Sequence, residues 1–81
     1  MKVGEFVYIT HGMLCSPGEI AENIRSYTIS SGKTQKEVFS TLHIDINQLT
    51  TMRRGHYPRI DVLYKIANYF GVTINDLVYK D

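Results

Sequence analysis

Basic side chains and side-chain amides gather in the middle of this 81-residue sequence. Residues 33–59 carry a net charge of +3, whereas the rest of the chain carries −2, so the total of +1 hides a local excess. Guanidinium and ammonium groups bind phosphate oxygens, and side-chain amides can hydrogen-bond the edges of bases. Because backbone phosphates supply most non-specific affinity for nucleic acid, a local basic surface matters more than the total charge.

Two helix-start signals lie inside this basic stretch. Thr34 with Glu37, and Asp45 with Gln48, each have the spacing of a capping box, in which the two side chains satisfy each other's backbone amides. These signals predict helices over residues 34–42 and 45–54, separated by a tight turn.

Arg53, Arg54 and Gly55 suit the carboxyl end of the second of these helices, where the last carbonyls are unpaired. Two short helices joined by a turn, the second ending in arginines, form the outline of a helix-turn-helix. This outline indicates an interaction with DNA.

The remaining sequence predicts three more helices. Ser16-Pro17-Gly18-Glu19 begins one that ends at Gly32, a second runs from Ile60 to Gly71, and Thr73 caps a short last one. We therefore expect an all-α, compact five-helix bundle over residues 16–81. Its predicted core is Ile24, Val38, Leu42, Leu49, Met52, Leu63, Ile66 and Phe70.

Residues 1–15 differ from the rest and are expected to form a short extended segment. Residues 2–9 are rich in β-branched and aromatic side chains and read as a strand, but no second convincing strand follows. The segment is a flexible arm, a strap packed on the bundle, or a strand that pairs with the same segment of another copy.

The sequence gives little support for a metal site, a phosphate-binding loop or a catalytic site. His11, His43 and His56 lack further ligands at metal-binding spacing, and neither a glycine-rich phosphate loop nor a nucleophile motif is present. We expect no enzyme activity, metal, cofactor or small-molecule ligand. No apolar run reaches the roughly 20 residues of a membrane span. The single Cys15 fits a reducing compartment, so we expect a cytoplasmic protein.

Two stretches of the sequence together resemble the lambda-repressor-like, or Xre/Cro-type, helix-turn-helix family. The first runs from Thr34 to Gly55, and the second is the block Tyr57-Pro58-Arg59-Ile60 through Ile66-Ala67 to Tyr69-Phe70-Gly71-Val72. The second block is similar to repressors from phages of Gram-positive bacteria. The resemblance covers residues 16–79.

Two positions depart from the family pattern. Phe39 stands where the family usually has alanine, and His43 stands where it usually has glycine with a positive φ. Phe39 is therefore expected either to splay the two helices or to rotate outward.

The resemblance implies roles for individual residues. Base edges in the major groove are expected to meet Ile46, Asn47, Gln48 and Thr51. Backbone phosphates are expected to meet Gln35, Lys36, Thr50, Arg53, Arg54, His56 and Arg59. For Arg59, capping of the preceding helix is an alternative.

The resemblance implies a bacterial or phage transcriptional regulator. It is expected to bind double-stranded operator DNA through residues 45–54, as a homodimer on a two-fold site. The alternative is a degenerate helix-turn-helix used for protein–protein contact, such as an anti-repressor or a dimerisation module. Phe39, His43, Ile46 and the near-neutral total charge favour that alternative.

Overall fold

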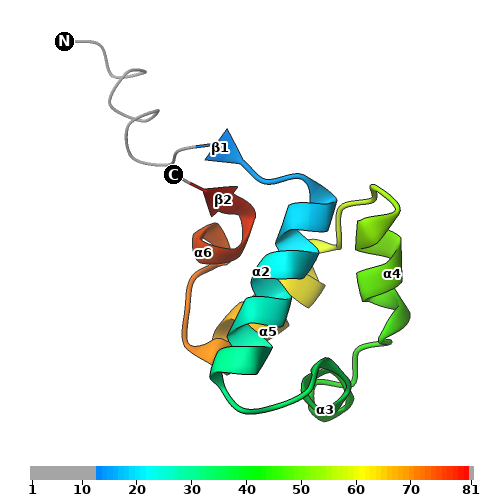
Figure 1. Cartoon of the computed structure of the whole chain (residues 1–81), viewed down its shortest axis with the longest axis vertical. Helices are drawn as coiled ribbons and strands as arrows, with labels where there is room; N and C mark the ends of the chain where they lie inside the picture. The colour runs from blue at the N-terminus through cyan, green and yellow to red at the C-terminus, as the bar shows by residue number, and fades with distance from the viewer. Residues whose placement is uncertain (1–12, 81) are drawn as a thin grey trace, which may run out of the picture.

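The computed structural model describes residues 13–80. Their elements follow in the order β1 (Met13–Leu14), α2 (Pro17–Ser30), α3 (Gln35–Thr41), α4 (Asn47–Arg53), α5 (Ile60–Phe70), α6 (Ile74–Val78) and β2 (Tyr79–Lys80). Helix α2 packs against α3, α4 and α6, while α5 packs against α6 (Figure 1). Across the described range the expected five helices are therefore confirmed.

A short antiparallel sheet joins the two ends of the described chain. Met13 pairs with Lys80 and Leu14 with Tyr79, and the amide of Cys15 donates to the carbonyl of Val78 at 2.7 Å. The sequence did not predict this pairing, because neither two-residue strand has a periodic pattern. The strand expected over residues 2–9 lies outside the described residues.

Three capping boxes begin helices where they were expected. At α2, α3 and α6 the cap residues Ser16, Thr34 and Thr73 accept a hydrogen bond from the third helical amide, and the acidic residue there accepts one from the cap amide. Each box satisfies donors that a helix leaves unpaired at its amino end. The beginnings of these helices are thus fixed by local sequence.

The expected capping box at Asp45 and Gln48 is wrong. Helix α4 begins at Asn47, and its cap position is occupied by Ile46, whose side chain makes no capping hydrogen bond. Asp45 Oδ1 instead accepts from the amide of Asn47 at 2.9 Å. An aspartate readily bonds the amide two residues on, and here that local bond replaces the box and shortens the helix.

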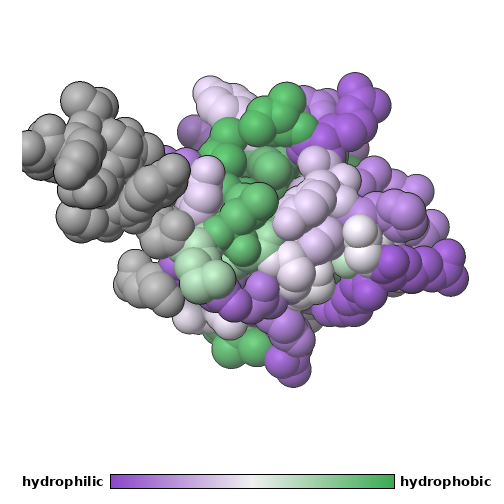
Figure 2. Space-filling view, turned by 90° about the horizontal axis from the view of Figure 1, so that it is seen from above, coloured by the Kyte–Doolittle hydropathy of each residue, from purple (hydrophilic) through white to green (hydrophobic). Residues whose placement is uncertain are grey.

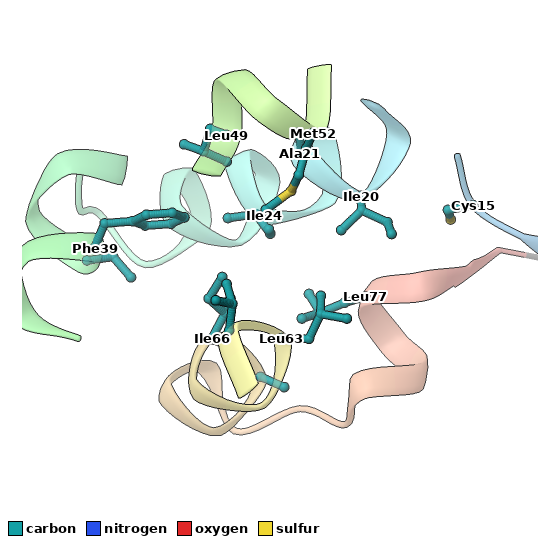
Figure 3. Packing of buried hydrophobic residues seen from close by; sticks show 13 residues of the cluster. Cys15, Ile20, Ala21, Ile24, Phe39, Leu49, Met52, Leu63, Ile66 and Leu77 are labelled. Atoms are coloured by element: carbon teal, nitrogen blue, oxygen red, sulfur yellow. The ribbon is translucent and has the colours of Figure 1, made fainter. Parts of the chain in front are cut away.

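Buried hydrophobic side chains from all five helices meet in one cluster (Figure 3). Its members are Cys15, Ile20, Ala21, Ile24, Val38, Phe39, Leu49, Met52, Val62, Leu63, Ile66, Ala67 and Leu77. Of the expected core, Leu42 and Phe70 are half-buried and pack against the edge of this cluster. The ring of Phe70 stacks on Tyr27 with a centroid distance of 5.5 Å.

Phe39 is the largest fully buried side chain among the described residues, with 1% of its surface exposed. Its ring points from α3 into the core towards Ile24 (Figure 3). Of the two alternatives expected for Phe39, outward rotation is therefore wrong. The departure from the family pattern places a bulky ring, rather than a small side chain, in the centre of the core.

Ile60 shares the helical spacing of the buried residues Leu63 and Ala67, but 69% of its surface is exposed. Successive helical residues are rotated by about 100°, and the buried face includes Val62 as well as Leu63 and Ile66. This shifts the centre of the buried face away from Ile60. Ile60 therefore lies at the margin, at the first residue of α5.

Candidate nucleic-acid interface

Helix α4 is amphipathic over seven residues. Leu49 and Met52 are buried in the core, and they fix the rotation of α4 about its axis against α2. Asn47, Thr50 and Thr51 are exposed on the opposite side. This arrangement leaves the polar face of the helix exposed. The major groove of double-stranded DNA is wide enough to admit such a helix.

The candidate base-contacting residues differ in how much of their surface is exposed and in their hydrogen bonds. Ile46 is 41% exposed and Asn47 is exposed, whereas Gln48 is half-buried at the margin beside the core. The hydroxyl of Thr51 donates to the carbonyl of Asn47 at 3.1 Å. This bond uses the hydroxyl hydrogen of Thr51, and the oxygen remains free to accept.

The turn before α4 has the backbone conformation that the sequence pattern predicted. His43 has a φ of +57°, in the left-handed region where most side chains are strained. The amide of Ile44 then donates to the carbonyl of Phe39 at 2.9 Å, which closes the end of α3. A helix-turn-helix geometry is thus reached with histidine in place of glycine.

The amino end of α3 carries the other residues expected to meet phosphate. Lys36 is exposed, and Gln35 is half-buried, with a buried Nε2 that has no hydrogen-bond partner in the described structure. Next to them, the Thr34 amide and then its hydroxyl hold the pKa of Glu37 below its ordinary value. A buried amide donor without a partner is costly, and the described residues supply none to Nε2 of Gln35.

Exposed arginine and histidine side chains surround the carboxyl end of α4. Arg53, Arg54 and His56 are exposed, and Gly55 between them has a φ of +99°. Arg59 follows at the cap position of α5, where its Nε lies 3.4 Å from Oδ1 of Asp61, and its side chain is 81% exposed. The structure therefore brings Arg53, Arg54 and His56 together and gives Arg59 an acidic partner of its own.

Tyr57 positions the loop between α4 and α5, a role that the sequence did not indicate. Its hydroxyl donates to the carbonyl of Cys15 at 2.8 Å, so the loop is tied to the end of β1. The two residues are far apart in the sequence, and no local pattern predicts their contact.

The fold and the polar face of α4 define a helix-turn-helix DNA-binding protein. In agreement, residues 23–79 match the family model of the Cro/C1-type HTH DNA-binding domain. The match spans more than half of the chain, and the chain belongs to this family. Searches of curated proteins and of solved structures gave no match.

The match begins within α2 and ends at the first residue of β2, so β1 lies outside it. Within residues 13–80, no helix combines the length and the apolar character that a membrane-spanning segment requires.

Proposed function

We propose that this protein is a sequence-specific transcriptional regulator of the repressor type. It binds double-stranded operator DNA with α4 and the residues that precede it, over residues 45–54, in the major groove. The observation that carries this proposal is the exposed polar face of α4, set opposite the buried Leu49 and Met52. The match of residues 23–79 to the Cro/C1-type family model supports the same class of protein.

Asn47 and Thr51 are the principal base-contacting residues in this proposal. The amide of Asn47 can bond adenine bidentately, and the free lone pairs of Thr51 accept from a base. Ile46 contacts a thymine methyl group, and the half-buried Gln48 contributes at the margin of the groove.

Phosphates on either side of the groove are bound by two groups of residues. Gln35 and Lys36 act from the amino end of α3, and Thr50, Arg53, Arg54 and His56 act from α4 and its loop. These contacts set the position of the protein on the duplex and carry no sequence information themselves. Arg59 contributes less than Arg53 or Arg54, because its Nε lies 3.4 Å from a carboxylate oxygen of Asp61, whose negative charge disfavours a nearby phosphate.

The active species is a homodimer on a two-fold operator, acting in the cytoplasm. A single seven-residue helix reads few base pairs, and two copies placed about one helical turn apart, roughly 34 Å, read two half-sites together. Residues 16–81 serve as its DNA-binding domain.

Selection of bound sequences from a random duplex library tests the proposal. Asn47→Ala is expected to lose about 1–3 kcal/mol of binding free energy on the selected site while non-specific binding is nearly unchanged. Asn68→Ala, an exposed asparagine on α5, is the matched control and is expected to leave both affinities unchanged. Equal losses of the Asn47 variant on selected and scrambled DNA would contradict a base-reading role.

A further inference from the structure

Several large apolar side chains are exposed along β1, the loop after α4 and the start of α5. Their exposed fractions are 65% for Met13, 56% for Leu14, 54% for Tyr57, 69% for Ile60 and 62% for Tyr64. We call this set the β1–α5 face. Exposed apolar surface of this kind usually marks an interaction site when the residues are contiguous.

Two structural features bring these residues next to one another. The hydrogen bond from the Tyr57 hydroxyl to the Cys15 carbonyl holds the loop after α4 beside β1. Ile60 and Tyr64 are four residues apart on α5, so they lie on one side of that helix. Viewed from the end that carries β1, a stretch of hydrophobic surface runs across the molecule beside hydrophilic residues (Figure 2).

Charges at the margin indicate what kind of partner fits this face. Arg59 and Asp61 flank Ile60 and form an exposed pair of opposite sign. In a two-fold contact the same patch meets itself, so a positive group can face a negative group in both directions. A patch with one charge of each sign is thus complementary to its own copy.

We propose that the β1–α5 face binds a second copy of this chain. Because β1 lies outside residues 23–79, this face adds a feature of this chain to the part that matches the family model. The inference rests on the proposed function, since it assigns the contact that makes the dimer.

The position of the face agrees with simultaneous DNA binding by both copies. Tyr57 and Ile60 follow the carboxyl end of α4, whereas Asn47 and Thr51 lie at its amino end and middle. A second copy seated on the β1–α5 face therefore leaves the polar side of α4 uncovered. Neither polar helix face is then part of the contact between the two copies.

The mass of the full chain in solution, measured by sedimentation equilibrium over a range of concentrations, tests the proposal. Ile60→Glu is expected to raise the dimer dissociation constant at least about tenfold, because a buried apolar contact becomes a pair of like charges. Ile29→Lys is the matched control, on an isoleucine that is 62% exposed near the carboxyl end of α2. The glutamate lies at the amino end of α5 and the lysine near the carboxyl end of α2, where the helix dipole favours a negative and a positive charge, respectively. Both variants are therefore expected to fold.

A mixing experiment tests the two-fold contact itself. Arg59→Asp and Asp61→Arg each place like charges opposite one another in their own homodimers, which are therefore expected to weaken. An equimolar mixture of the two variants is expected to form the heterodimer more tightly than either variant forms its homodimer, since opposite charges then meet.

The inference would be overturned by a wild-type chain that stays monomeric throughout, by a dimer that Ile60→Glu does not weaken, or by a mixture with no preference for the heterodimer. A dimer that appears only after deletion of residues 1–12 would also contradict it, because this leader would then be the occupant of the face. The proposed function is judged separately, by the affinity of the wild-type chain for DNA.

Discussion

The hydroxyl of Tyr57 donates a hydrogen bond to the backbone carbonyl of Cys15 at 2.8 Å. Tyr57 lies in the loop that follows α4, and Cys15 lies between β1 and α2. The amide of Cys15 in turn donates to Val78, next to β2. Cys15 thus connects the carboxyl-terminal segment, strand β1 and the loop beside the candidate phosphate-binding arginines.

Tyr57→Phe is expected to lower the free energy of unfolding by about 0.5–1.5 kcal/mol, because it removes one hydrogen bond and leaves the carbonyl of Cys15 without that donor. Urea denaturation at a single protein concentration measures this loss. Tyr64→Phe, which removes a hydroxyl from an exposed tyrosine of α5, is the control and is expected to change the stability by less than about 0.5 kcal/mol. Equal effects of the two substitutions would mean that the hydrogen bond contributes nothing.

The contact between Glu19 and Lys80 predicts a dependence of stability on pH. The ammonium of Lys80, followed by the backbone amide of Ser16, lowers the pKa of Glu19 from 4.5 to about 2. Because the folded pKa lies below the unfolded one, the ionised carboxylate stabilises the fold fully above about pH 4.5. This contribution is lost as the pH falls towards about 2.

Glu19→Gln is therefore expected to lower the urea midpoint at neutral pH and to reduce its fall between about pH 4.5 and pH 2. Glu22→Gln controls for the loss of one negative charge from α2, since Glu22 is 3.9 Å from Arg25 and 62% of its side chain is exposed. The pKa of Glu37 is also lowered, so part of the fall remains in both variants. A Glu19 variant with the wild-type pH profile would contradict the assignment.

The left-handed backbone of His43 predicts a substitution that stabilises the fold. His43→Gly removes the steric cost of a side chain at a φ of +57°, partly offset by the greater freedom of glycine in the unfolded chain. The expected net gain is up to about 1 kcal/mol in the free energy of unfolding. Gly71→Ala, at a φ of +69°, is the reciprocal change and is expected to destabilise. A loss of stability in His43→Gly would show that the imidazole makes a favourable contribution larger than the backbone strain.

Features that depend on neighbours in the sequence were predicted well. The capping boxes at Ser16, Thr34 and Thr73 each join residues three apart, and all three are confirmed. The polar face of α4 followed from the apolar spacing of Leu49 and Met52, which are both buried.

Features that depend on distant residues were not predicted. The pairing of Met13 with Lys80 and the hydrogen bond between Tyr57 and Cys15 join residues that lie far apart in the sequence. The burial of Phe39 also required the structure, since the sequence left open whether its side chain splays the two helices or rotates outward. At the candidate site, the half-burial of Gln48 depends on where α4 begins, which the Asp45 side chain alters locally.

The salt dependence of DNA binding tests the central claim most directly. For the full chain on its selected duplex, the logarithm of the association constant is expected to fall linearly with the logarithm of the salt concentration. Arg54→Ala is expected to reduce the slope by about one unit, whereas Lys65→Ala, which removes the same charge from an exposed position on α5, is expected to leave it unchanged. An affinity that does not change with salt, or a slope that Lys65→Ala reduces as much as Arg54→Ala does, would contradict DNA binding through α4.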